Sequence, residues 1–220
     1  MGYAPLVNWR NFTVPNLKSI LEVYPDMLKS VTQREAYDII EDNLGGYKKT
    51  AYQFACQLGL EDKSKEIFEI QNYLYSFDDN NLKKYLEFWF KIYYAPNPFV
   101  KSDDESIIIY KEIAESVLNS SDNEINFTEF FNNKIGGPRP DILVNCIEAL
   151  GNPLKIKRRD SNIYVYIDTK DKGMLKTQID LTNQFPMPKD KKDRHLFFER
   201  YSYENFCKFP SFPFFSEKII

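Results

Sequence analysis

Apolar residues recur every three or four positions near the start of the chain. This spacing predicts three helices, over residues 16–28, 33–44 and 47–60. The capping box that begins at Thr32 supports the second helix, and Gly45 and Gly46 then end it. Apolar and polar residues alternate after Ile67, which predicts a strand that continues to about Tyr75. The pattern therefore indicates a helix-turn-helix followed by a strand.

A similar order of elements recurs later in the chain. Residues 125–133 have the spacing of a short helix with its phenylalanines turned inward, and Gly136 and Gly137 follow it. Residues 140–150 then predict a second helix, which ends at Gly151. Residues 154–167 predict two strands joined by a turn at residues 159–162. A helix-turn-helix followed by a strand or hairpin is thus expected twice.

Two helices are predicted between these units. The first is capped by Asp78 or Asp79 and is aromatic on nearly all sides, which favours burial. The second runs through Ile109 and Val117 into a polar linker at residues 119–123. The expected organisation is an N-terminal unit, a helical connector, a second unit and an aromatic C-terminal arm, over residues 1–77, 78–122, 123–182 and 183–220.

The C-terminal arm is unusually rich in phenylalanine and tyrosine. So many exposed aromatic rings would favour aggregation, so the arm is expected to pack over a domain or to dock on a partner protein. Packing within the chain is the favoured interpretation.

Composition places the chain among globular proteins. With 220 residues, 43% of them hydrophobic and only 8 glycines, it is long enough for one large domain or two small ones. The expected fold class is mainly α with small β-hairpins (α+β), built as two similar units joined by helices. The net charge of −3 hides an uneven distribution, because residues 134–176 carry nine basic and five acidic side chains. An anionic partner would meet that segment.

Several classes of function find little support. No apolar run approaches a bilayer span and the first residues do not resemble a secretion signal, so a cytoplasmic protein without membrane contact is expected. Three cysteines lack CxxC spacing, His195 is the only histidine, and the glycine pairs lack P-loop spacing. No resident cofactor or structural metal is therefore predicted.

The second helix of each helix-turn-helix carries side chains suited to DNA. Cations at a helix start oppose the helix dipole but suit phosphates, and Gln, Arg and Asn can pair with base edges in the major groove. The alternative is an ordinary solvated helix end, with Asp141 as a helix cap. The candidate contacts are Lys48, Lys49, Thr50, Tyr52 and Gln53 in the first unit, and Arg139 and Asn145 in the second.

The predicted hairpin is strongly basic. Lys155, Lys157, Arg158 and Arg159 lie within five positions, and strand alternation places the two lysines on the face opposite Ile156. Such a ribbon could neutralise several phosphates, which makes binding sensitive to salt. The competing interpretation is an edge strand protected from aggregation by lysine.

Residues 125–167 resemble a winged-helix domain, and residues 16–75 resemble a less complete one. The resemblance implies that the second helix of each pair docks in the major groove while the hairpin contacts backbone or minor groove. Tandem winged helices of this kind occur in DNA-reading parts of some restriction enzymes and in plasmid replication initiators. The resemblance therefore implies a sequence-preferring, double-stranded DNA-binding protein, plausibly of a restriction or phage-defence system, with catalysis in a partner.

Two alternative functions stay open. Pro140-Asp141 and Asp168-Thr169-Lys170 resemble the signature of a large nuclease superfamily. That resemblance implies that Asp141 and Asp168 hold Mg²⁺ and that Lys170 orients water. The second alternative is a winged-helix adaptor that binds protein instead of DNA. It is suggested by the aromatic arm and by residues 61–133, which carry seven basic and 15 acidic side chains. Little in the sequence favours catalysis by this chain itself.

Overall fold

The computed structural model describes residues 13–27, 35, 38, 73–96, 105–137, 139–185, 187 and 199–209. These residues form a mainly helical α+β structure with two small antiparallel sheets. The predicted helices and strand within residues 28–72 lie outside the described residues, apart from Glu35 and Asp38. The proposed division into units stays a prediction.

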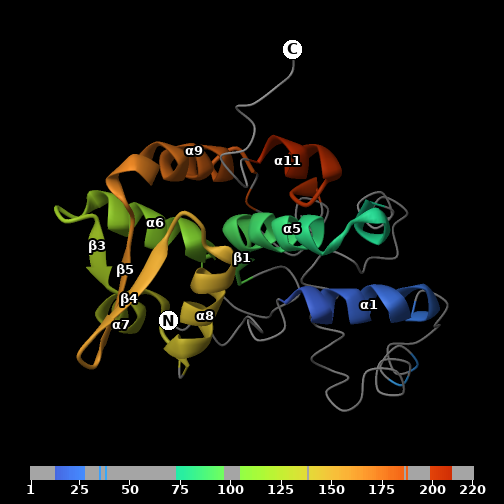
Figure 1. Ribbon diagram of the computed structural model, residues 1–220, viewed down its shortest axis with the longest axis horizontal. Helices are drawn as coiled ribbons and strands as arrows, with labels where there is room; N and C mark the ends of the chain where they lie inside the picture. Colours follow the sequence, from blue (N-terminus) through green and yellow to red (C-terminus); the bar gives the residue numbers. More distant parts are fainter. Residues whose placement is uncertain are drawn as a thin grey trace.

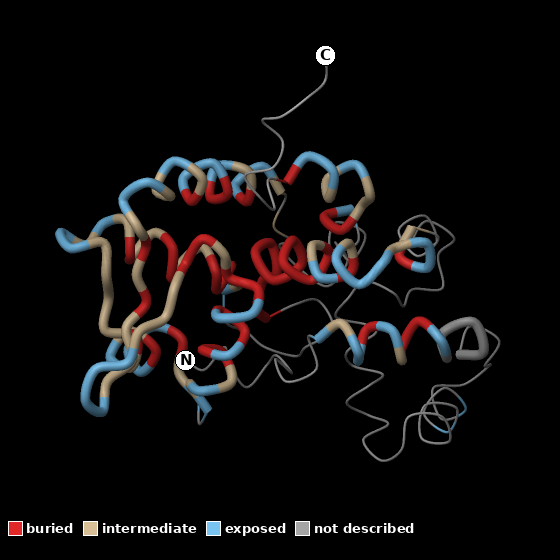
Figure 2. The backbone as a smooth tube through the Cα atoms, in the orientation of Figure 1, coloured by how far each residue is buried: buried red, intermediate tan, exposed pale blue. Residues whose placement is uncertain are grey.

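Helix α5 (Asp79–Ile92) is the centre of the structure. Asp78 caps it, since its side chain accepts a hydrogen bond from the backbone N–H of Asn81 at 2.8 Å. Its last eight residues are all buried, as Figure 2 shows, and it contacts α1 (Val14–Met27), α6 (Ile109–Asn119), α8 (Pro140–Leu150) and α9 (Lys172–Thr182). The prediction that this aromatic helix is core is therefore confirmed.

A small two-stranded sheet connects α5 with the next helix. Strand β1 (Tyr94–Ala95) pairs antiparallel with β2 (Ile107–Ile108), and α6 follows directly. Neither strand was predicted, because two residues are too few to display an alternating pattern. Helix α6 itself is confirmed over nearly the expected range.

A second sheet lies at one end of the molecule (Figure 1). It contains β3 (Glu124–Asn126), β4 (Lys155–Arg159) and β5 (Asn162–Tyr166) in the order β3-β5-β4, all antiparallel. The predicted hairpin is confirmed. Its turn is narrow, and Asp160 adopts a positive φ of 52°, a conformation that Asp tolerates better than most residues.

Between β3 and β4 lie two helical segments. Helix α7 (Phe127–Phe130) continues as a π-helical turn over Phe131–Ile135, and α8 then occupies the predicted residues 140–150. Pro140 at the first position suits a helix start, because its missing N–H would have no partner there. Helix α8 packs on β4 and α7 on β5, so both helices cover the same sheet.

Two predictions at element boundaries are wrong. Residues 73–76 are helical, whereas the strand after Ile67 was expected to reach about Tyr75. The helix expected from Ile125 begins at Phe127, because residues 124–126 pair with β5 as a strand. At residues 124–126, pairing with a strand about 40 residues along the chain overrode the local pattern.

The C-terminal part of the chain returns to α5. Helix α9 follows a 3₁₀ turn (Thr169–Asp171), and the short helix α11 (Tyr203–Lys208) lies beyond it, above α5 in Figure 1. The ring of Phe88 lies 5.8 Å from that of Phe206 and 5.5 Å from that of Phe209. For the described part of the aromatic arm, packing within the chain is confirmed.

Candidate nucleic-acid interface

The register of the three-stranded sheet assigns its side chains to two faces. Ile125, Val165 and Ile156 lie in one row across the three strands, on the side that faces the helices. Val165 belongs to the core, and the two isoleucines pack against it. Their neighbours point the other way, as the pleat requires. We call this opposite side the outer face; it carries Glu124, Asn126, Lys155, Lys157, Arg159, Asn162, Tyr164 and Tyr166.

Basic side chains of the hairpin separate as alternation predicts. Lys155 and Lys157 share the outer face with Arg159, whereas Arg158 points to the helix side. None of the four is buried. Three cations are therefore presented on one side of a short, twisted ribbon.

Each of these four cations has a carboxylate partner. Lys155 Nζ lies 2.5 Å from Asp168 Oδ2, and Arg158 Nη1 lies 2.6 Å from Glu148 Oε1 on α8. Glu124 pairs with two cations, Lys157 through Oε2 and Arg159 through Oε1, the latter at 3.0 Å. The positive charge of the hairpin is thus largely balanced within the protein, which the sequence did not indicate.

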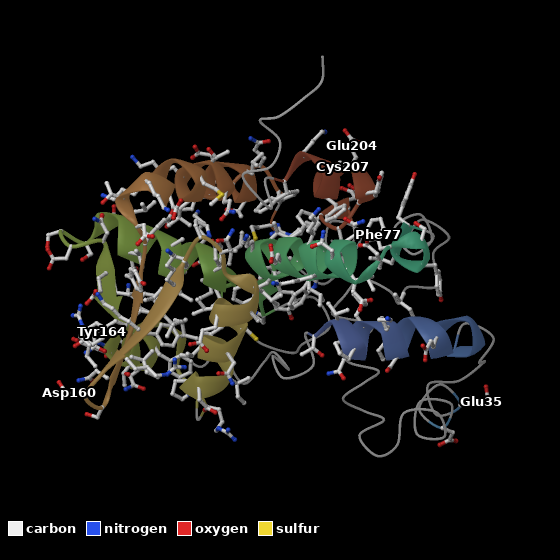
Figure 3. The ribbon with its side chains drawn as sticks, in the orientation of Figure 1. Glu35, Phe77, Asp160, Tyr164, Glu204 and Cys207 are labelled. Atoms are coloured by element: carbon white, nitrogen blue, oxygen red, sulfur yellow. The ribbon has the colours of Figure 1, made fainter. Side chains whose placement is uncertain are left out.

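Each of the two outer-face tyrosines contacts one of the cations through its ring. Lys157 Nζ lies 4.8 Å from the ring centroid of Tyr166, and the guanidinium carbon of Arg159 lies 5.3 Å from that of Tyr164. Such distances allow cation–π attraction. Figure 3 labels Tyr164 beside the hairpin turn at Asp160. The rings and Glu124 together restrict two long side chains to one geometry.

Titration of these groups follows their partners. The hydrogen bond with Lys155 lowers the pKa of Asp168 and raises that of Lys155, and the hydrogen bond with Glu148 raises the pKa of Arg158. Lys157 differs, because burial and then the charge of Arg159 lower its pKa, with Asp122 opposing. Burial is thus the larger cause of the lowered Lys157 pKa, and the like charge of Arg159 on the same face adds to it.

Helix α8 turns a polar side outward. Its buried side consists of Leu143, Val144, Cys146, Ile147 and Leu150. Asn145 is exposed, one turn beyond Asp141, as predicted. Arg139 precedes the helix and makes a two-point contact with Asp141, at 2.9 Å and 2.7 Å. The structure therefore places the predicted base-reading residues Arg139 and Asn145 on the surface, together with an acidic side chain.

The predicted contacts of the first unit cannot be placed. Lys48, Lys49, Thr50, Tyr52 and Gln53 all lie outside the described residues.

The carboxylates of the alternative nuclease site belong to separate ion pairs. Asp141 is held by Arg139 at the start of α8, and Asp168 is held by Lys155 after β5. Lys170 is exposed in the 3₁₀ turn. Within the described ranges, no group of three or more His, Cys, Asp or Glu side chains could hold a metal ion. These separate ion pairs give no particular support to a magnesium site.

Sequence reasoning missed the three outer-face residues that contact Lys157 and Arg159, which are Glu124, Tyr164 and Tyr166. The two tyrosines had a local signal, because they alternate with Val165 in the predicted second strand. Glu124 had none. Its position beside Lys157 and Arg159 depends on the pairing of β3 with β5, across about 40 residues of chain.

Among the described residues, no helix is long and apolar enough to cross a membrane. Comparisons of the chain with protein-family profiles, with curated proteins and with solved structures found no match.

Proposed function

We propose that this chain binds double-stranded DNA, with some sequence preference, through a winged-helix unit that adds α6, expected as part of the connector, to the unit expected from residue 123 onward. The order α6, β3, α7, α8, β4, β5 supports the assignment, since a helix-turn-helix is followed directly by a hairpin. The sheet order β3-β5-β4 supports it as well, because a strand from before the helix pair completes the hairpin.

One observation carries the proposal: three cations share the outer face of a hairpin that directly follows this helix pair. In this interpretation the hairpin contacts phosphates, and the N-terminal end of α8 enters the major groove. Arg139 then reaches guanine and Asn145 reaches adenine. The hairpin supplies most of the affinity, and α8 supplies the sequence preference.

Ion pairs on the hairpin do not prevent this role. The pairs of Lys155 with Asp168 and of Arg158 with Glu148 are exposed, and such pairs contribute only about 0–1 kcal/mol each, so a phosphate can replace these carboxylates at small cost. Arg159 is suited to such an exchange, because 56% of its side chain is exposed and a guanidinium can bind two phosphate oxygens.

The biological setting belongs to the same proposal. A restriction or phage-defence system, with catalysis in a partner protein, is the setting that the winged-helix resemblance suggests.

Replacing Arg159 with Gln tests the proposal. We expect Arg159→Gln to weaken binding to a randomised duplex pool about fivefold at low salt, because one phosphate contact is lost. The slope of log K against log salt should fall by about 1. Fluorescence anisotropy at several salt concentrations measures both quantities.

Lys208→Gln is the matched control. It removes one charge from an exposed ion pair on α11, and 61% of the Lys208 side chain is exposed. We expect near wild-type binding from this variant. Equal losses in the two variants would contradict the hairpin site, and absence of binding by the wild type at low salt would favour the adaptor. Cleavage of the same duplexes only with Mg²⁺, abolished by Asp168→Ala, would favour the nuclease.

A further inference from the structure

Glu124 occupies an unusual place for an acidic residue at a surface proposed to meet DNA. It begins β3, stands opposite Tyr166 on the outer face, and only 15% of its side chain is exposed. A carboxylate there opposes the approach of phosphate. The position of Glu124 would be explained if its carboxylate took part in the binding of DNA.

The contacts of Glu124 are those that a phosphate group would make. Its two oxygens are divided between two cations, Oε2 with Lys157 and Oε1 with Arg159. A DNA phosphate also presents two anionic oxygens, and it binds ammonium and guanidinium donors in the same manner. The pair is further defined by the ring contacts of Lys157 with Tyr166 and of Arg159 with Tyr164.

Asp168 provides a comparison on the same face. Its ion pair is with Lys155, and 38% of its side chain is exposed. The Glu124 side chain is less exposed than that of Asp168, and it pairs with two cations instead of one. Its charge therefore affects the phosphate affinity of both Lys157 and Arg159. The three cations of the outer face pair with only two carboxylates, Glu124 and the adjacent Asp168, so one positive charge is left in excess.

We propose that Glu124 occupies a phosphate site of the hairpin in the free protein. Lys157 and Arg159 form that site, and a backbone phosphate of duplex DNA displaces the carboxylate when it binds. Glu124 is thus a positioning residue, which holds both cations in a binding geometry and lowers the affinity for DNA. This inference rests on the proposed DNA-binding function and adds the regulation of its affinity.

Glu124→Gln tests the inference, since it removes the competing charge while keeping the size of the side chain. The variant should bind the randomised duplex pool about fivefold more tightly than the wild type, with a salt slope steeper by about 1. Glu204→Gln on α11 is the matched control, because it removes one carboxylate from an exposed pair with Lys208. Figure 3 shows Glu204 at the top of the molecule, away from Tyr164 at the end that carries the hairpin. Its binding should stay within about twofold of the wild type.

Combining Arg159→Gln with Glu124→Gln separates the interaction of the two residues from small changes in fold that each substitution causes by itself. Arg159→Gln should weaken binding more strongly when Glu124 is already Gln, because Arg159 then has no carboxylate to leave. Equal effects of Arg159→Gln in both backgrounds would overturn the inference. So would unchanged or weaker binding by Glu124→Gln. If Arg159→Gln alone still weakens binding, only the role of Glu124 fails; if neither the wild type nor Glu124→Gln binds, both proposals fail.

Discussion

At the scale of single residues, Lys91 brings a cation into the buried helix α5. Its side chain is fully buried, and its Nζ lies 5.8 Å from the ring centroids of both Tyr110 and Phe209. Burial lowers the pKa of Lys91 to about 8, although Glu87 one turn earlier opposes the shift. Burial likewise raises the pKa of Glu87, against the charges of Lys91, Lys83 and Lys84. Both groups therefore reduce the stability of the fold at neutral pH.

Lys91→Met should remove the contribution of the Lys91 titration to the pH dependence of the free energy of unfolding. Between about 8 and the ordinary value of 10.5, the unfolded chain holds the Lys91 proton more tightly than the folded protein does. The stability of the wild type therefore rises with pH in this window and is lowest below it. Relative to the variant, the free energy of unfolding should increase by about 2 kcal/mol from about pH 7.5 to about pH 9.5.

Urea denaturation at the two pH values measures this difference. Lys176→Met, which changes an exposed lysine of α9, should retain the wild-type increase. An increase of the same size in Lys91→Met would show that another group is responsible.

At the scale of elements, Gly151 and Gly173 differ in the space that a Cβ atom would have at each position. Gly151 ends α8, and a Cβ atom there would lie 2.6 Å from the backbone oxygen of Ile147. Gly173 lies in the first turn of α9, and a Cβ atom there would meet nothing within 4 Å. The first glycine is required by packing against its own helix, and the second is not.

Alanine at the two positions should consequently have opposite effects. Gly151→Ala should lower the free energy of unfolding by about 1–3 kcal/mol, because the backbone at the end of α8 must shift. Gly173→Ala should raise it by about 0.5–1 kcal/mol, because alanine favours the helix and restricts the unfolded chain. Denaturation curves of both variants under one condition test the pair, and a loss of stability in Gly173→Ala would contradict the assignment.

At the scale of the whole molecule, the return of the chain to α5 depends on Arg200. This arginine is buried and donates a hydrogen bond to the backbone oxygen of Ile92 at the end of α5. Its guanidinium carbon also lies 4.8 Å from the ring centroid of Tyr94 and 5.4 Å from that of Phe185. One side chain thus connects α5, β1 and the start of the C-terminal arm at Phe185.

Arg200→Ala should release the arm. The variant loses packing and leaves the Ile92 oxygen without its donor, so we expect the free energy of unfolding to fall by about 2–4 kcal/mol. Hydrogen exchange should accelerate most at the Phe206 and Phe209 amides, which bond within the arm itself. Arg158→Ala, at an exposed pair with Glu148, serves as the control. Unchanged exchange at Phe206 in Arg200→Ala would contradict the anchoring role.

Elements with strong local signals were predictable from the sequence. The Asp78 cap and the hydrophobic spacing predicted α5, the residues from Pro140 to Gly151 predicted α8, and the turn near Asp160 predicted the hairpin. The separation of Lys155 and Lys157 from Ile156 also follows from strand alternation alone. These features depend on neighbours a few positions apart, so the sequence by itself determined them.

Other features were decided only by tertiary structure. Three residues after a turn form β3 because β5 offers hydrogen bonds to them, and the same pairing carries Glu124 to Lys157 and Arg159. The sequence predicted a hairpin with four cations and did not indicate their partners, whereas the fold brings three carboxylates to them, Glu124 being shared by two. Strand pairing and ion pairing join residues that lie far apart in the chain, so no local pattern encodes them.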